Sequence, residues 1–130
     1  MGTDYLIDTN IAIYFLDGLL PPASLPFIRS VFEGNFAVSI ITKIELLGWQ
    51  FPDSSKMDIT ERFLDCSMIF FLDDAVVEQT IFLRRTHKIK LPDALIAATA
   101  MVNDLTLLSR NDKDFTAIPT LKYFNPFTLS

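Results

Sequence analysis

The stretch LIDTNIAIYFL, Leu6 to Leu16, shows the pattern that decides the fold: a short apolar run, a carboxylate and then a helix. We expect Asp4 to Ile7 to form a buried strand that ends at Asp8. From Asn10 to Leu16 the apolar residues recur at helical spacing, and Asp17-Gly18 closes the helix. The stretch therefore predicts a strand followed directly by a helix, with an acidic side chain at the junction.

The same alternation continues along the chain. Further strands are expected at 36–41, 68–72, 105–109 and 121–124. Helices are expected over 27–34, from Ser54 or Ser55 to Cys66, and over 92–103. Two more are expected to begin after a capping residue: one after Thr42, and one over 75–86 after Asp73. Apolar strands that alternate with amphipathic helices form a mostly parallel sheet covered on both faces. We therefore predict one domain, residues 1–130, with a three-layer α/β/α sandwich fold.

Composition narrows the class of protein. Half of the 130 residues are hydrophobic and 21% are charged, which is typical of a globular domain. The net charge of −5 argues against a broad electrostatic hold on nucleic acid, although local contacts remain compatible with it. The longest apolar runs are too short to span a membrane, and we expect no secretory signal. The single cysteine, Cys66, excludes an internal disulfide, so we expect a cytoplasmic protein in which Cys66 is a buried core residue.

Acidic residues follow several of the predicted strands. Asp8 ends the first strand, and Glu45 lies one turn into the helix after the second. Asp93 lies in the first turn of its helix, and Asp112 and Asp114 follow the fourth strand. All of these places lie on one rim of a parallel sheet. Carboxylates gathered there without a partner repel one another, whereas Mg²⁺ or Mn²⁺ requires such an oxygen-rich cluster.

Asp93 also has a purely structural interpretation. It begins the alanine-rich stretch LPDALIAATA, Leu91 to Ala100, directly after Pro92. Proline suits the first helical position, and an acid in the first turn complements the helix dipole. The other acids on the same rim favour the metal-ligand interpretation over this one.

These pieces together resemble a PIN domain and, within that superfamily, the VapC-type toxins of toxin–antitoxin pairs. The matching pieces are LIDTNIAIYFL, the helix with Thr42, Glu45 and Leu46, LPDALIAATA, LLSRNDKDF (107–115) and the terminal YFNPF (123–127). The resemblance covers essentially the whole chain in the expected order. It implies a PIN-like sandwich and a metal-dependent endoribonuclease that leaves 5′-phosphate and 3′-hydroxyl ends.

The resemblance also implies roles for individual residues. Asp8, Glu45 and Asp93 match the family's three most dependable acids, which hold Mg²⁺ or Mn²⁺. Where many relatives have a fourth acid this chain has Asn111, and either Asp112 or Asp114 replaces it; we take both as catalytic candidates and Asp114 as a metal ligand. The neighbouring polar residues are expected to orient carboxylates or water: Thr9, Asn10, Ser109 and Asn111. Capping or turn formation explains Thr9, Asn10 and Ser109 equally well.

Basic residues near the acids are candidates for contact with the RNA backbone: Arg84, Arg85, Lys88, Lys90, Arg110 and Lys113. A solvated helix end is the alternative for those between 84 and 90. The resemblance implies a small antitoxin as partner, and a homodimer. The apolar segments 11–20, 27–32 and 44–51 are candidates for the partner surface.

Two other functions remain open at this point. The first is a catalytically silent PIN scaffold that acts as a binding module, which Asn111 favours and the three intact acids oppose. The second is a Mg²⁺-dependent phosphate-handling α/β domain, such as a receiver or a phosphatase. Asp73 and Asp74 follow a strand as a receiver would require, but the paired acids near the first strand are missing.

Overall fold

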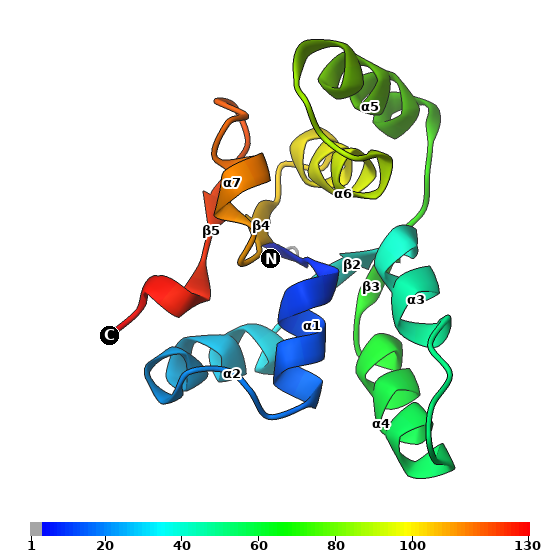
Figure 1. Cartoon of the computed structure of the whole chain (residues 1–130), viewed down its shortest axis with the longest axis vertical. Helices are drawn as coiled ribbons and strands as arrows, with labels where there is room; N and C mark the ends of the chain where they lie inside the picture. The colour runs from blue at the N-terminus through cyan, green and yellow to red at the C-terminus, as the bar shows by residue number, and fades with distance from the viewer. Residues whose placement is uncertain (1–3) are drawn as a thin grey trace.

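Five short parallel strands form the central sheet of the computed structural model, which describes residues 4–130 (Figure 1). The strands lie in the order β3-β2-β1-β4-β5. Their bounds are Tyr5–Ile7 for β1, Phe36–Ser39 for β2, Met68–Phe70 for β3, Thr106–Leu108 for β4 and Tyr123–Phe124 for β5. In the middle of the sheet Leu6 lies opposite Ala37 on one side and Leu107 on the other. All four pairings are parallel, so the carboxyl ends of the strands share one edge.

Helices occupy every connection between these strands. They are α1 (Thr9–Leu16), α2 (Leu25–Glu33), α3 (Ile40–Leu47), α4 (Ser54–Asp65), α5 (Asp74–Thr86), α6 (Leu91–Val102) and α7 (Asp112–Phe115). Two short 3₁₀ helices, η1 (Pro22–Ser24) and η2 (Pro126–Thr128), complete the described chain. Within residues 4–130, no helix is both long enough and apolar enough to cross a membrane.

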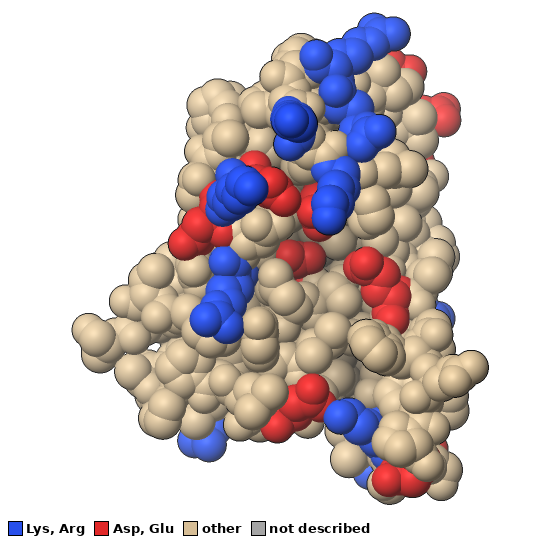
Figure 2. All heavy atoms as spheres, in the orientation of Figure 1, with Lys and Arg blue, Asp and Glu red and all other residues tan. Residues whose placement is uncertain are grey.

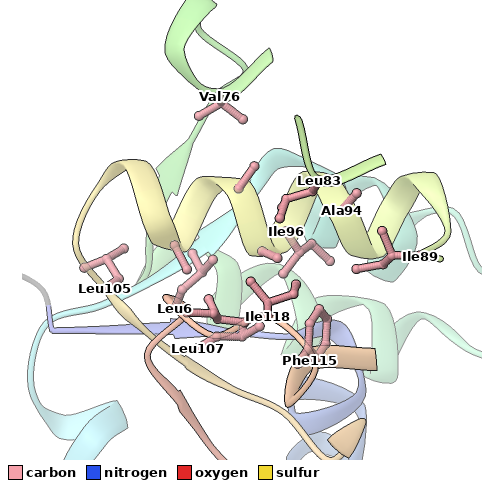
Figure 3. Close-up of a cluster of buried hydrophobic side chains, with 14 of the residues drawn as sticks. Leu6, Val76, Leu83, Ile89, Ala94, Ile96, Leu105, Leu107, Phe115 and Ile118 are labelled. Carbon is pink, nitrogen blue, oxygen red and sulfur yellow. The ribbon is translucent and has the colours of Figure 1, made fainter. Parts of the chain in front are cut away.

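Two hydrophobic cores lie on opposite faces of the sheet, because successive strand residues point to opposite sides. Leu6 and Leu107 pack with α5 and α6 residues such as Leu83 and Ile96 (Figure 3). Ile7 and Leu108, the next residues along the same strands, pack in the second core, to which α1, α2, α3 and α4 contribute. The three-layer sandwich predicted from the sequence is therefore confirmed.

The structure corrects several local predictions. The strand expected at 36–41 ends at Ser39, because the Ser39 hydroxyl accepts a hydrogen bond from Ile41 N (3.1 Å) and caps α3. Thr42, the predicted cap, is instead a buried residue inside α3. Cys66 is exposed rather than buried, because it follows the last residue of α4. The short helix α7 was not predicted, since four residues are too few to show a helical period.

Candidate active site

The acids predicted from the sequence lie at the carboxyl edge of the sheet. Asp8 directly follows β1, Glu45 lies in α3 after β2, and Asp93 lies in the first turn of α6. Asp114 lies in α7, which follows β4. Figure 2 shows acidic atoms in the middle of the face in view, with basic atoms above them and to their left. The order of the strands thus brings segments about 100 residues apart in the sequence to one edge.

Asp8 is the most buried of these acids, with 4% of its surface exposed. It caps α1, and its Oδ1 atom accepts a hydrogen bond from Thr9 N (2.8 Å). Its Oδ2 atom accepts one from the Ser109 hydroxyl (2.7 Å). Burial raises the pKa of Asp8 to about 6, the Ser109 and Thr9 bonds oppose that rise, and the charges of Asp93 and Glu45 add to it. The carboxylate is thus fixed in orientation but forms no ion pair within the described residues.

Glu45 reaches the same place from α3. Its Oε1 atom accepts a hydrogen bond from the Thr9 hydroxyl (2.6 Å), which also lies 3.0 Å from the hydroxyl of Thr42. Thr9 therefore contacts two acids: its backbone N–H donates to Asp8, and its side-chain hydroxyl donates to Glu45. The role of Thr9 in orienting the carboxylates stays a prediction, and the contact of Thr42 with Thr9 was not predicted. Thr42 stood out in the sequence only as a helix cap.

Asp93 is half-buried in the first turn of α6, after Pro92. The residue before the helix, Lys90, makes no side-chain capping bond. Burial raises the pKa of Asp93, as do the charges of Asp114 and Glu45, while Lys90 lowers it. Asp93 therefore stands among the other acids, and dipole complementarity alone does not describe its surroundings.

The two candidates for the fourth acid have different surroundings. Asp114 acts on the pKa of Asp93, and its Oδ2 atom accepts a hydrogen bond from Asn111 Nδ2 (2.9 Å). Asp112 is exposed, and its carboxylate accepts hydrogen bonds from Tyr123 (2.5 Å) and from Asn125 (3.1 and 3.2 Å). Of the two, Asp114 belongs to the acidic cluster, and Asp112 is held by the C-terminal segment.

Ser109 joins the remaining polar residues of the site. Besides donating to Asp8, its hydroxyl accepts hydrogen bonds from Asn10 Nδ2 (3.3 Å) and from Asn111 N (3.0 Å). Asn10 Oδ1 in turn accepts one from the backbone of Arg110 (3.3 Å). The start of α1 and the loop after β4 are thereby held together around Asp8.

The basic residues predicted to contact RNA differ in their surroundings. Arg84 Nη1 donates to the carbonyl of Ile89 (2.7 Å), so this residue holds the connection between α5 and α6. Lys90 lies near enough to Asp93 to lower its pKa. The other four side chains are exposed: Arg85, Lys88, Arg110 and Lys113. Arg110 also has a structural contact, because its Nη1 atom donates to the Tyr14 hydroxyl (3.1 Å). The structure therefore gives two of the six candidates, Arg84 and Arg110, a structural contact.

The donor set fits a divalent cation. The ion pairs seen within residues 4–130 lie elsewhere, at Asp17 and Asp104, so the clustered acids have no lysine or arginine as a partner there. Carboxylate oxygens are the ligands that Mg²⁺ and Mn²⁺ prefer. In the conformations seen, no three Asp, Glu, His or Cys side chains of the described residues are close enough together to hold one ion. An ion held by three of these acids would require at least one carboxylate to rotate, and Glu45 is the exposed member of the set.

Comparison with known proteins agrees with this fold. Residues 5–121 match the PIN domain family. A chain of a toxin–antitoxin complex from Klebsiella pneumoniae is 30% identical, with a TM-score of 0.78, over 95% of this chain and 98% of that chain. FitAcB from Neisseria gonorrhoeae is 26% identical, with a TM-score of 0.80, over 96% of this chain and 99% of that one. VapBC2 from Rickettsia felis, crystallised with promoter DNA, has a TM-score of 0.80 at 23% identity, over 95% and 98%. No curated protein sequence matches the chain.

The family match spans β1 to the residues just before β5, so it includes all the acids discussed above. The resemblance noted in the sequence is thereby confirmed. The chain belongs to the PIN domain family.

Proposed function

We propose that this protein is a Mg²⁺- or Mn²⁺-dependent endoribonuclease and the toxin of a toxin–antitoxin pair. The observation that carries the proposal is the convergence of Asp8, Glu45, Asp93 and Asp114 on one edge of the sheet, with no ion-paired lysine or arginine among residues 4–130 to balance them. The family match favours a nuclease over the phosphate-handling domain considered above. The three intact acids favour it over a silent scaffold.

The chain supplies ligands and their orientation. Asp8 and Asp93 would hold the cation, with Glu45 and Asp114 completing the set directly or through water. When bound, such a cation lowers the pKa of a water molecule and neutralises charge on the phosphate. Ser109 and Thr9 favour the ionised form of Asp8, because both donate hydrogen bonds to its carboxylate.

Exposed basic side chains near the acids would bind the RNA backbone. Arg110 follows Ser109, and Lys90 precedes Asp93 by three residues, so both lie beside the acids. Phosphate contacts of this kind position a nucleic acid without reading its sequence. We expect RNA binding to weaken as salt concentration rises.

The proposal is tested by incubating purified protein with RNA and Mn²⁺, with and without EDTA. Asp8→Asn removes the negative charge of the central ligand while keeping its size. Asp58→Asn is the matched control, since Asp58 is an exposed acid on α4, a helix that contributes no acid to the site. We expect cutting by wild type and by the control, and none by Asp8→Asn or with EDTA. Equal activity in wild type and Asp8→Asn would refute the proposal.

An apolar hollow beside the acids supports the antitoxin as partner. It has a volume of about 250 Å³ and lies between α1, α3 and the segment before α4. Its apolar lining includes Ile13, Leu16, Leu46, Trp49, Phe51 and Pro52. A second, more open hollow includes Trp49 and Glu45, so the apolar surface reaches the acidic cluster. We propose that an apolar segment of the antitoxin occupies this surface, as part of its inhibition of the site.

Trp49→Ala tests this part of the proposal, because 65% of the Trp49 surface is exposed and available to a partner. With a cognate antitoxin as ligand, we expect the variant to bind it at least about tenfold more weakly. RNA cleavage by the free toxin should not change. Unchanged affinity would place the antitoxin elsewhere.

We also propose that the protein acts in the cytoplasm as a homodimer. Exposed apolar side chains at the end of β3 and on α5 offer a surface for a second copy: Phe71, Leu72, Val77, Ile81 and Phe82. Light scattering after gel filtration measures the mass directly. Phe82→Glu should yield the monomer mass, and a wild-type mass equal to one chain would refute the dimer.

A further inference from the structure

The carboxylate of Asp112 makes contacts that the metal chemistry does not use. Its Oδ1 atom accepts hydrogen bonds from the Tyr123 hydroxyl (2.5 Å) and from Asn125 Nδ2 (3.1 Å), and its Oδ2 atom accepts one from Asn125 Nδ2 (3.2 Å). Asn125 is buried, with 8% of its surface exposed. Both donors lie at the C-terminal end, in β5 or just after it. Asp112 thus ties the start of α7 to the C-terminal segment.

Tyr123 contacts the loop after β4 at a second point. Its hydroxyl oxygen lies 3.1 Å from the carbonyl oxygen of Ser109, the residue whose side chain donates to Asp8. Burial and the neighbouring Asp112 carboxylate raise the pKa of Tyr123, so the phenol keeps its proton and acts as a donor. The Tyr123 hydroxyl therefore lies between Ser109 and Asp112, with the shorter hydrogen bond to Asp112.

Arg110, in the same loop, makes a further contact with the C-terminal segment, at Phe127. Its guanidinium carbon lies 4.2 Å from the centre of the Phe127 ring and 5.3 Å from that of Tyr14, within the range of cation–π attraction. Arg110 Nη1 also donates to the Tyr14 hydroxyl (3.1 Å). Asn125 connects the Asp112 and Phe127 contacts, because its Oδ1 atom accepts a hydrogen bond from Phe127 N (2.9 Å) while its Nδ2 atom donates to Asp112. The loop 109–112 is therefore held at both ends by residues 123–127.

We propose that Asp112 is a positioning residue, which acts through Tyr123 and Asn125 to place Ser109 against Asp8 and to hold α7, the helix that carries Asp114. The inference rests on the proposed function for its consequence in catalysis. Asp114, not Asp112, is the acid of α7 whose charge acts on Asp93, and both oxygens of Asp112 already accept hydrogen bonds from the C-terminal segment. The opposite role, Asp112 as a metal ligand, makes different predictions for the same variants.

Three variants separate the two roles: Asp112→Asn, Tyr123→Phe and the double variant. Tyr123→Phe removes one hydroxyl and leaves every carboxylate in place. Two readouts are measured for each: the affinity for Mn²⁺, from electron paramagnetic resonance of the free ion, and kcat for RNA cleavage. Asp104→Asn is the matched control. Asp104 forms an ion pair with Lys122 (2.6 Å), and these two residues lie just before β4 and β5, at the amino ends of the strands and away from the acids.

A positioning residue acts through its partners, so the effects of the two single variants should be similar and should not add. We expect each to lower kcat by about tenfold, because displacing a catalytic group by about 1 Å costs up to about a hundredfold. We expect each to weaken Mn²⁺ binding by about threefold, and the double variant to match the singles in both readouts. KM and the melting temperature should change little, and Asp104→Asn should match wild type.

Two results would overturn the inference. One is a loss confined to Asp112→Asn, with Tyr123→Phe equal to wild type, which is the pattern of a metal ligand. The other is an equal loss in Asp104→Asn, which would indicate general weakening of the C-terminal strand. If wild type binds Mn²⁺ but does not cut RNA, the proposed function fails, and Mn²⁺ affinities alone decide the role of Asp112. If wild type binds no Mn²⁺, both proposals fail.

Discussion

Replacing Asp8 by asparagine should make the metal-free protein more stable at pH 7.5, although it removes a hydrogen-bonded group. Asp8 is 4% exposed, and burial raises its pKa to about 6 from an ordinary value of 3.8. At about 1.4 kcal/mol for each pH unit, this difference corresponds to a cost of about 3 kcal/mol for keeping the charge in the folded protein. The asparagine side chain has no charge to bury, so the variant avoids that cost.

The sign depends on pH. Because folding raises the pKa of Asp8, the folded protein holds this proton more tightly than the unfolded chain does. The contribution of Asp8 to stability is complete below about pH 4 and is lost as the pH rises through about 6. The advantage of Asp8→Asn should therefore be largest above pH 6 and should vanish near pH 4.

Urea unfolding in EDTA measures this effect as the difference in free energy of unfolding between wild type and Asp8→Asn at pH 7.5 and at pH 4. A gain of about 3 kcal/mol should also raise the melting temperature by about 10 °C for a chain of this size. Asp58→Asn, at an exposed site, should change the free energy by less than about 0.5 kcal/mol. If Asp8→Asn is no more stable than wild type at pH 7.5, or its advantage persists at pH 4, the reasoning from burial is wrong.

Two further predictions follow from the packing. Phe127→Leu removes the ring beneath Arg110, so KM for RNA should rise about threefold to tenfold. Steady-state kinetics that show an unchanged KM would contradict the proposed contact of Arg110 with RNA. Leu107→Ala leaves a cavity at a fully buried position in β4 and should lower the free energy of unfolding by about 2–5 kcal/mol in urea titrations. Leu19→Ala, at a position 62% exposed, should have almost no effect, and equal losses in the two variants would contradict the assigned core.

The sequence predicts the layers of this fold well, because short apolar runs and helical spacing depend on local chemistry. Ile7 and Leu108 mark their strands, and Ile28 marks the buried side of α2. The boundaries are less predictable. Ser39 and Thr42 are both good caps in a sequence, and only the backbone conformation selects Ser39. The extent of β5 could not be predicted either, since two of the four expected residues, Leu121 and Lys122, lie before the strand.

The places of three acids in the cluster were also predictable from the sequence. Asp8, Glu45 and Asp93 each lie at a fixed place after a strand or at a helix start, so a parallel topology brings them to one edge. Asp114 was predicted as a metal ligand, but the anchoring of Asp112, two residues earlier on the same four-residue helix, was not predictable. It depends on Tyr123 and Asn125, whose packing against the loop no local pattern reveals.

The candidate RNA-binding residues show a related limit. The sequence gives the charge of the segment 84–90 but does not indicate which side chains have partners. Arg84 is held by the carbonyl of Ile89, five residues further on, whereas Lys90 lies beside Asp93. Only the path of the chain between α5 and α6 distinguishes these two roles.

The chemistry of the RNA ends produced by purified protein is the most direct test of the central claim. Mass spectrometry of a short RNA cut with Mn²⁺ should show 5′-phosphate and 3′-hydroxyl ends, because water attacks the phosphodiester. The same products should be missing with EDTA and in Asp93→Asn. Ends with a 2′,3′-cyclic phosphate, or equal cutting by Asp93→Asn, would contradict metal-dependent hydrolysis by this cluster of acids.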